Sequence, residues 1–369
     1  MSKRTFDGFF KSSPAQKEES ENQPQDQHPE DRSSRSSNHP TYPWPVPYLP
    51  TSVGSEVETL VLSQGKEINN QPHLDLLYFQ PFIPRNIEHK LFEFLRGELF
   101  FYRVEYKIQR FGKETQIRTP RFTTVFGIDD TSSFSNESAF CIVEASGSGK
   151  GKPVSKTKYK CQPRPIPECL DLLRRVTEAA TNSQYNICLV NYYATGDDSI
   201  SYHSDDERFL GPDPTIASFS LGAKRDFLMK HKPTPPPSTA KCSRSPTTPA
   251  INPHTTPRTT STTIPISTST SASSSSAATT PLKFQLASGD MLLMRGPTQS
   301  HWLHSIPKRK DGGAGGGPGG VRGRINITLR RARVPAGTEN YYQYNVGKGE
   351  VWKWDNATRK MLPWKGSMA

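Results

Sequence analysis

The chain has 369 residues, with 47 Lys and Arg against 35 Asp and Glu, so its formal net charge is +12. Hydrophobic residues make up only 33%, which argues against one uniform globule and favours a compact core diluted by polar segments. No stretch approaches the ~18 apolar residues of a membrane span, and residues 1–10 lack the apolar core of a secretory signal. The five cysteines form no C-x-x-C pair, so the sequence indicates neither a zinc finger nor a disulfide framework, and a reducing, intracellular location is the default expectation. The positive charge indicates an anionic partner, most commonly nucleic acid.

Low-complexity segments divide the chain into its expected units. Residues 13–55 are rich in Ser, Pro, Gln and charged side chains, and we expect them to be disordered because they cannot bury enough apolar surface. Between 233 and 281, 35 of 49 residues are Ser, Thr or Pro, which predicts a solvated, disordered insertion. We expect one domain over 56–345 interrupted by this insertion, because the entropic cost of a long loop grows only logarithmically with its length.

Within this domain the apolar pattern predicts two helices early in the chain and many short strands. A strand at 76–79 precedes a helix that begins after Pro84, and a second helix covers 167–180. The apolar faces of the two helices hold Ile87, Leu91, Phe94, Leu95, Leu170, Leu173 and Val176. Further strands are expected at 187–193, 217–221, 227–230, 284–286, 291–294 and 325–329. Without alternating β-α units, this order predicts an α+β fold with a mainly antiparallel barrel or sandwich.

A possible metal site begins with the pair His203-x-Asp205. Residues two apart on a strand project to the same side, so the imidazole and the carboxylate can share one ion. The third ligand must come from elsewhere, and the candidates are His301 and His304. Two histidines and one carboxylate on one face of an octahedron leave three positions open, as in non-haem iron(II) oxygenases. The pair taken alone is more typical of a surface ion pair, and only its neighbourhood in the sequence favours a metal site.

The segment 324–330 alternates without a break between polar and apolar residues. Arg324, Asn326, Thr328 and Arg330 share one face of the expected strand, and this face either lines a pocket or meets water. In a pocket, the two guanidinium groups would bind carboxylates in bidentate fashion. Asn191 and Tyr193 share a face of another expected strand, where they either add hydrogen bonds to the same dicarboxylate or, for the tyrosine, serve in packing.

Taken together, these spaced elements resemble the AlkB family of iron(II)- and 2-oxoglutarate-dependent dioxygenases, and they are most similar to its eukaryotic DNA-repair branch. The resemblance covers about 73–232 and 282–333. It implies a double-stranded β-helix (jelly-roll) core with supporting N-terminal helices. It also implies that iron is held by His203, Asp205 and His304, the last of these because the family's ligand precedes Ser-Ile/Leu-Pro, as in 304–307 here.

The same resemblance assigns the co-substrates and the reaction. Arg324 would bind the far carboxylate of 2-oxoglutarate, helped by Asn191 and Tyr193, and Arg330 would lie near the end that chelates the metal. With O2, such enzymes form succinate and carbon dioxide and hydroxylate an N-methyl group, which leaves as formaldehyde. The implied substrates are 1-methyladenine and 3-methylcytosine in DNA. An RNA demethylase of the same family, or an inactive nucleic-acid-binding module, is the alternative.

Several residues are candidates for contacts with a flipped alkylated base and its duplex. Residues 109–113 form an expected hairpin tip, in which Phe111 matches the family position that fills the gap left by the flipped base. An apolar wedge of this kind offsets part of the unstacking cost. Its other reading is a hairpin core residue. The other candidates are Arg110, Arg121, Glu207, for a hydrogen bond to the base edge, and Tyr159, for stacking on the base.

The two ends of the chain carry aromatic clusters. Residues 1–12 contain Phe6, Phe9 and Phe10, and this pattern resembles the box that binds the replication sliding clamp, although Lys3 replaces the usual glutamine. The alternative is an adventitious aromatic cluster. Residues 346–369 form an aromatic C-terminal extension, and we expect part of it to extend the sheet; the alternative is a stacking surface for single-stranded nucleic acid. We expect a nuclear monomer without a membrane span.

Overall fold

The computed structural model describes residues 36–37, 42, 45–61, 64–103, 105–135, 141–233, 281–309, 323–345 and 350–366, and every structural statement below concerns this part of the chain. The candidate clamp box and nearly all of the Ser/Thr/Pro insertion lie outside these residues. Within the described residues, no helix is long and apolar enough to cross a bilayer.

Three helices near the start of the domain have one apolar face each. Pro84 precedes α2 and Pro167 precedes α3, so each helix begins where a missing backbone N–H costs nothing. The predicted start of α2 and both predicted bounds of α3 agree with the structure within one residue, and Ile87, Leu91 and Leu173 are fully buried as expected. The helices of the structure are α1 Thr51–Glu58, α2 Arg85–Glu98, α3 Glu168–Thr181, α4 Thr298–His301 and α5 Pro335–Asn345, with short 3-10 turns at Gly147–Gly149 and Arg208–Leu210.

A ten-stranded sheet forms the centre of the domain. Its order is β20-β19-β5-β8-β11-β18-β13-β16-β4-β3, in which β18 lies between β11 and β13 and pairs antiparallel with both. The expected strands at 76–79, 187–193 and 291–294 have the predicted bounds. The ten strands are β3 Lys66–Ile68, β4 Leu76–Phe79, β5 Phe101–Tyr102, β8 Phe122–Gly127, β11 Ile187–Tyr193, β13 Ile216–Gly222, β16 Met291–Met294, β18 Arg324–Arg330, β19 Val351–Asp355 and β20 Lys360–Pro363.

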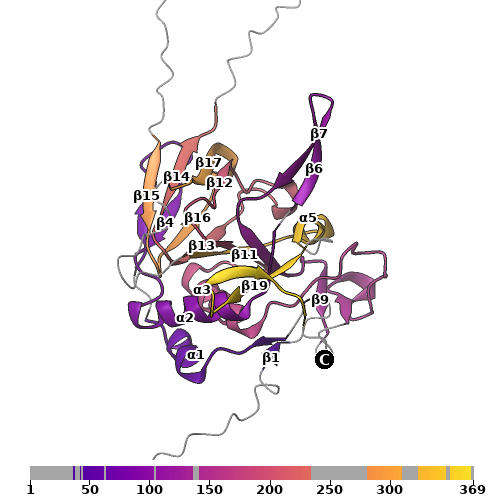
Figure 1. The fold of residues 1–369 in the computed structure, drawn as a ribbon. Helices are drawn as coiled ribbons and strands as arrows, with labels where there is room; N and C mark the ends of the chain where they lie inside the picture. Colours follow the sequence, from indigo (N-terminus) through magenta and orange to yellow (C-terminus); the bar gives the residue numbers. More distant parts are fainter. Residues whose placement is uncertain are drawn as a thin grey trace, which may run out of the picture.

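A second sheet of four strands, in the order β12-β17-β14-β15, faces the first. These strands are β12 Ile200–His203, β14 Arg225–His231, β15 Leu282–Leu286 and β17 Trp302–Ile306. Two hairpins project from the body, one formed by β6 Glu105–Arg110 and β7 Lys113–Arg118, the other by β9 Ser132–Phe134 and β10 Ile142–Glu144 (Figure 1). A two-residue pair, β1 Ser36–Ser37 with β2 Val46–Pro47, completes the strands.

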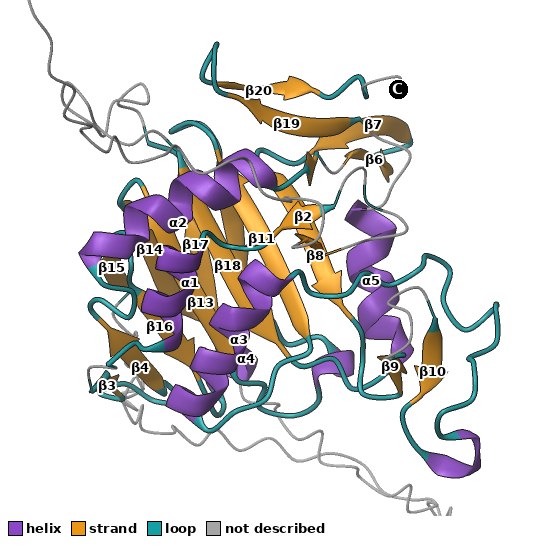
Figure 2. Cartoon of the chain, turned by 90° about the horizontal axis from the view of Figure 1, so that it is seen from below, coloured by secondary structure: helices purple, strands orange, loops and turns teal. Residues whose placement is uncertain are grey.

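The arrangement is a jelly-roll with helices on one outer face. Helices α1, α2 and α3 lie across the large sheet (Figure 2), and their apolar residues form the main core with the side chains that this face presents. Ile325, Ile327 and Leu329 of β18 belong to that core, so the other face of β18 turns toward the small sheet. The alternation of polar and apolar residues in this strand therefore separates a helix-covered core from an internal cavity, as the sequence predicted for a pocket-lining strand.

The predicted start of the ordered domain at residue 56 is wrong. Val46, Leu49, Val53 and Val57 are all buried in the main core, where α1 contacts both α2 and α3. Although 13–55 is mostly polar, its last ten residues include three apolar side chains that pack in this core, Val46, Leu49 and Val53, so the folded domain begins earlier.

The C-terminal aromatic residues extend the sheet, as expected. β19 pairs with β5, and β20 pairs with β19 at the edge. The indole of Trp354 packs edge-on against Tyr192, and the Arg96 guanidinium lies 4.0 Å from its ring centroid. Trp354 therefore belongs to the helix-covered core.

Candidate metal and co-substrate site

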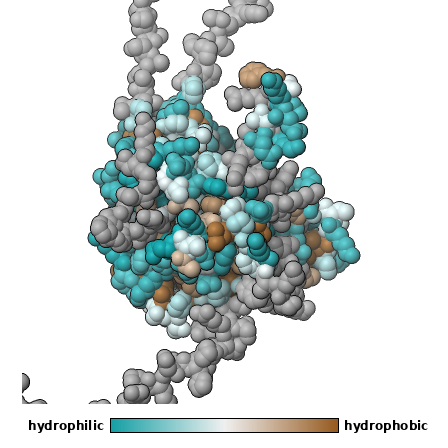
Figure 3. Space-filling model, in the orientation of Figure 1, coloured by the Kyte–Doolittle hydropathy of each residue, from teal (hydrophilic) through white to brown (hydrophobic). Residues whose placement is uncertain are grey.

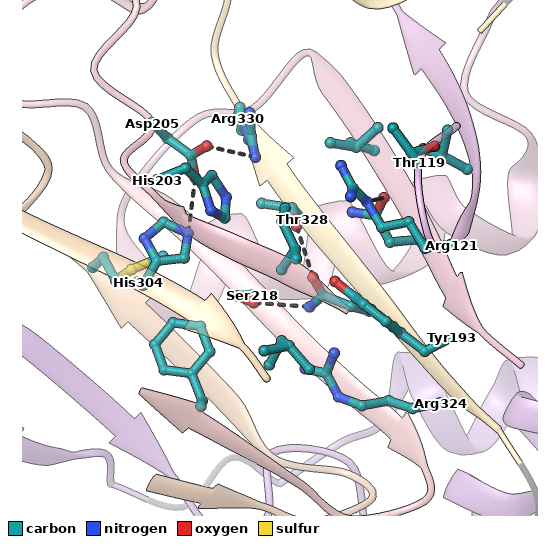
Figure 4. A pocket seen from close by; sticks show the side chains of 18 of the residues that line it. Thr119, Arg121, Tyr193, His203, Asp205, Ser218, His304, Arg324, Thr328 and Arg330 are labelled. Carbon is teal, nitrogen blue, oxygen red and sulfur yellow. Dashed lines mark hydrogen bonds and ion pairs between the residues drawn. The ribbon is translucent and has the colours of Figure 1, made fainter. Parts of the chain in front are cut away.

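A cavity of about 350 Å³ lies between the two sheets and opens to solvent. The four polar side chains of β18 line it, as do Asn191 and Tyr193 of β11. Every residue predicted to hold the metal or the 2-oxoglutarate thus reaches one space. Figure 4 shows these side chains converging from opposite walls: His203, Asp205 and His304 from the small-sheet side, and Arg324 and Thr328 from β18.

Three donor side chains meet at one end of this cavity. His203 ends β12 and lies directly opposite His304 of β17 in the sheet register, and Asp205 follows β12 by two residues. Their ligand atoms all lie within 4.8 Å of one another, and no second group of three such donors occurs among the residues described. The pairing of β12 with β17 therefore joins positions that are about a hundred residues apart in sequence.

The donor atoms are held in an arrangement that fits a metal ion. Oδ1 of Asp205 accepts from Arg330 Nη2 at 2.9 Å, whereas its buried Oδ2 has no hydrogen-bond partner and lies 3.7 Å from His304 Nε2. Nδ1 of His203 lies 2.9 Å from the carbonyl of Ser201, which orients the other ring nitrogen toward the cluster. A buried carboxylate oxygen without a partner is costly, so this donor set indicates a cation.

Electrostatics keep all three donors deprotonated at neutral pH. Burial lowers the pKa of His304 to about 3, with a further contribution from the neighbouring His203, whose own pKa burial also lowers. Burial alone would raise the pKa of Asp205, but Arg330 and the two imidazoles outweigh it and hold that pKa below its ordinary value. Neutral imidazoles and an ionised carboxylate are the forms that bind metals.

His301, the rival third ligand, lies elsewhere. Its ring stacks on His73 with centroids 3.9 Å apart, and His231 lies 5.9 Å away. It precedes β17 at the end of α4, so it does not share the inward face of His304. The alternative that sequence spacing left open is thus resolved in favour of His304.

At the other end of the cavity, Arg324 provides a buried positive charge. The residue is 1% exposed, and Nη2 donates to Ser220 Oγ at 2.8 Å. Nε and Nη1 have no hydrogen-bond partner, and no carboxylate of the described residues pairs with this guanidinium. Burial lowers its pKa to about 10, so it remains charged at neutral pH. A buried cation without a counter-ion indicates that an anionic ligand completes the site.

The sequence comparison agrees with this geometry. Residues 75–330 match the model of the 2OG-Fe(II) oxygenase superfamily. The chain belongs to that superfamily. The name of this superfamily includes iron(II), which the donor triad fits, and 2-oxoglutarate, which the buried Arg324 fits.

Curated relatives confirm the resemblance to AlkB-type dioxygenases. The chain is 32% identical over 167 residues to the DNA oxidative demethylase ALKBH2 of Arabidopsis thaliana, covering 45% of this chain and 43% of the relative. It is 33% identical over 169 residues to ALKBH2 of Mus musculus (46% and 52%) and 29% identical over 179 residues to alkB homolog 3 of Homo sapiens (48% of each). The match spans about half of the length of these relatives. The solved structure of OsALKBH1 aligns at 15% identity with a TM-score of 0.36, over 72% of this chain and 100% of that one.

A polar wall joins the two ends of the oxygenase site. Asn326 Nδ2 donates to Ser218 Oγ at 2.9 Å and to the Phe219 carbonyl at 2.7 Å, so its orientation is fixed. Asn191 lies opposite Asn326 in the register and accepts from Arg121 Nε at 3.1 Å. Arg121, predicted as a DNA contact, therefore reaches the cavity lining.

Two neighbours of Arg330 also line the cavity, the acidic Glu207 and the aromatic Tyr341. Arg330 Nη1 donates to the Tyr341 hydroxyl, which comes from α5. The pKa of the Arg330 guanidinium is raised, because Asp205, Tyr341 and Glu207 outweigh the effect of burial. Sequence reasoning did not find this role of Tyr341, since nothing in a C-terminal aromatic run indicates a contact eleven residues upstream. Glu207 also lines the cavity, with a buried Oε2 that has no partner and a pKa that burial raises, and its hydrogen bond to a base edge stays a prediction.

The remaining predicted DNA contacts differ in their exposure to solvent. Phe111 stands at the tip of the β6–β7 hairpin and is 95% exposed, which rules out the hairpin-core reading; Figure 3 shows an apolar patch at this tip. Arg110 ends β6, and its side chain lies outside the described set. The prediction for Tyr159 is wrong: it is 9% exposed in a small separate cluster with Ile128 and Ile142, away from the cavity.

Proposed function

We propose that this protein is an iron(II)- and 2-oxoglutarate-dependent oxidative demethylase that acts on N-alkylated bases, 1-methyladenine and 3-methylcytosine, in DNA. The observation that carries the proposal is one cavity in which a His-Asp-His donor set and a buried, unpaired arginine lie at opposite ends. The relatives named as DNA oxidative demethylases support the choice of reaction and substrate.

The residues of the cavity have separable roles in this reaction. His203, Asp205 and His304 would hold the iron, which supplies the activation of O2 when bound. Arg324 would bind the distal carboxylate of 2-oxoglutarate, with the Tyr193 ring 5.4 Å from its Cζ atom. Arg330 fixes one carboxylate oxygen of Asp205 and leaves the other free for the metal. The methyl carbon would be hydroxylated, and the resulting hemiaminal would break down to formaldehyde and the unmodified base.

The hairpin favours duplex DNA over RNA as the substrate. A phenylalanine that is 95% exposed at the end of a two-stranded projection, with the basic side chain of Lys113 beside it, suits insertion into a base stack. Removal of the target base from the stack leaves a gap that such a ring can fill. A nuclear location follows from this substrate and is part of the proposal.

The test is oxygen-dependent formaldehyde release from a methylated duplex oligonucleotide, with iron(II) and 2-oxoglutarate added. We expect release from the wild type and none from His203→Ala. His301→Ala is the matched control: it removes a nearby histidine of the same domain that lies outside the donor set, and it should retain activity. Equal activity of His203→Ala and wild type would contradict the metal assignment.

A parallel assay on methylated RNA of the same sequence separates the two enzyme hypotheses. Turnover confined to RNA would replace DNA as the substrate, and the absence of turnover on either, with iron and 2-oxoglutarate bound, would favour an inactive binding module. The complete donor set and the buried arginine argue against that last outcome.

A further inference from the structure

The β9–β10 region forms a folded basic lobe, defined here as residues 128–161 without the part that the structure does not describe. β9 pairs with β10, and the chain returns alongside β10 through hydrogen bonds from Val154 N to the Ile142 carbonyl and from Glu144 N to the Lys152 carbonyl. The lobe has its own small apolar cluster around Ile142 and Tyr159. It is therefore an ordered platform, not a loose loop.

The charge of this lobe is unbalanced at its surface. Lys158 is half-buried and pairs with Glu144 at 2.5 Å, so those two charges cancel. Asp129 accepts from the hydroxyls of Tyr159 and Thr338, and it faces inward. The outward side chains are the exposed lysines Lys150, Lys152, Lys156 and Lys160, of which only Lys160 has an ion pair among the described residues, at 3.5 Å from Glu339.

The lobe is joined to a wall of the active cavity. The Asp129–Thr338 hydrogen bond and the Lys160–Glu339 pair both reach α5, the helix whose Tyr341 lines the cavity beside Arg330. Thr119 and Arg121 at the base of the β6–β7 hairpin form another part of the lining. Figures 1 and 2 both place the hairpin, α5 and the lobe along one side of the molecule.

We propose that the lysines of this lobe bind the phosphate backbone of a duplex that the hairpin also contacts. The inference rests on the proposed function and deepens it: the hairpin enters the stack at the target base, while the lobe binds flanking phosphates. Lysines act as point charges toward phosphates and carry no sequence information, so the lobe sets position and affinity, not base choice.

The test uses Lys150→Ala, Lys152→Ala and Lys156→Ala combined in the full-length protein. The matched control combines Lys66→Ala, Lys90→Ala and Lys283→Ala, which removes the same charge from exposed lysines on β3, α2 and β15. Binding of an unmodified duplex is measured across a range of salt concentrations. We expect the slope of log affinity against log salt to fall by about 0.9 for each lysine in contact, with a slope near that of wild type in the control.

A slope equal to wild type in the lobe variant, or an equal loss in the control, would overturn the inference. The variant should also release formaldehyde from a methylated oligonucleotide of a few nucleotides at the wild-type rate, since this substrate is too short to reach the lobe. If the proposed function fails, the wild type releases no formaldehyde on any substrate, yet the binding slopes still decide the role of the lobe.

A second observation concerns a buried amide next to the metal donors. Gln299 of α4 is fully buried, and its Oε1 accepts the backbone N–H of Asp205 at 2.8 Å. Its Nε2 lies 3.2 Å from Met294 Sδ, and its own carbonyl accepts from Lys232 Nζ at 3.0 Å. Lys232 also pairs with Asp206 at 2.6 Å. Two hydrogen-bonded connections thus tie the loop that carries Asp205 to α4.

We infer that Gln299 is a positioning residue for the metal ligand Asp205. The loop after β12 has little regular structure of its own. The hydrogen bond from the backbone N–H of Asp205 to Gln299 Oε1 therefore fixes the backbone that carries the Asp205 carboxylate. Groups that orient a ligand without touching the metal typically contribute 10- to 100-fold to metal affinity.

The test compares Gln299→Leu and the unbranched Gln299→Met with Ser300→Ala, an exposed neighbour on the same helix. Iron(II) affinity is measured anaerobically in the presence of saturating 2-oxoglutarate, and thermal unfolding is measured without metal. We expect both Gln299 variants to bind iron(II) about tenfold more weakly and the Ser300 variant to be unchanged. Lower thermal stability with unchanged iron affinity would show a structural role only and would refute the inference.

Discussion

At the scale of single residues, the site combines two buried charged groups that each have polar atoms without a hydrogen-bond partner. Asp205 has one carboxylate oxygen paired and one free, and Arg324 has two nitrogen atoms without an acceptor. Such groups are costly in an interior unless a ligand completes them. The fold thus tolerates an unfavourable local arrangement at both ends of one cavity, and this is what a site for a cation and a dianion requires.

Replacing Arg324 by Met should weaken 2-oxoglutarate binding at least about 30-fold, because loss of one partner of a buried charge pair costs about 2 kcal/mol or more. The same change should leave the unliganded protein equally or more stable, since it removes a buried charge without a counter-ion. Anaerobic 2-oxoglutarate titration and urea unfolding provide the two measurements. A variant with normal co-substrate affinity would exclude the assignment.

The unliganded protein should also lose stability in acid through His304. Above pH 6.5 this imidazole is neutral in both the folded and the unfolded chain. Below pH 6.5 the unfolded chain takes up a proton that the folded site resists until about pH 3, so the free energy of unfolding falls. Between pH 7 and pH 5 we expect a loss of about 2 kcal/mol from this residue. Urea unfolding at both pH values, with His304→Gln as the control, should show a flatter dependence in the variant.

At the scale of secondary structure, alternation within strands was the most reliable signal. The period-two pattern of 324–330 correctly divided the side chains of β18 between two faces of the strand. The structure shows that the polar face lines the cavity and that the apolar face belongs to the core. The choice between His301 and His304 needed the family pattern or the structure, since the short α4 between the sheets shifts which residues face inward. Tyr159 failed for a related reason: it follows a loop whose fold no periodicity specifies.

The β6–β7 hairpin allows a prediction about duplex substrates. Phe111→Ala should reduce demethylation of duplex DNA about tenfold, since base extrusion costs a few kcal/mol that the ring partly offsets, and should leave single-stranded substrate nearly unaffected. Phe111→Leu, which keeps an apolar wedge, should retain most of the activity. Because the side chain is 95% exposed, thermal stability should be unchanged in both. Equal losses on the two substrates would remove the role assigned to the ring.

At the scale of the whole molecule, the edges of the fold were hardest to predict. The mostly polar sequence before residue 56 concealed three buried aliphatic side chains, Val46, Leu49 and Val53, and only their packing in the main core shows where the domain begins. The aromatic C-terminal residues were correctly expected on the sheet, because so many aromatic side chains favour burial over solvent. Whether the N-terminal box at Phe6, Phe9 and Phe10 binds a sliding clamp stays a prediction.

Trp354 of β19 should contribute to global stability and not to the site. Trp354→Ala should lower the free energy of unfolding by about 3 kcal/mol, since the indole is 8% exposed and packs against Tyr192 and Arg96. Leu362→Ala on the neighbouring strand, where the side chain is 41% exposed, should cost about 0.5 kcal/mol or less. Denaturant unfolding provides the comparison. Affinity for 2-oxoglutarate measured on folded protein should be equal in both.

The pairing of β14 with β15 has a consequence for engineering. Met229 pairs with Leu282, so the long Ser/Thr/Pro segment enters and leaves the small sheet through two adjacent, hydrogen-bonded strands. The donors His203 and Asp205 precede this junction and His304 follows it. The chain could therefore be opened there and expressed as two fragments, neither of which carries a complete set of metal ligands. Their reassociation would restore the third ligand, which would make oxygenase activity a reporter of whether the two fragments have met.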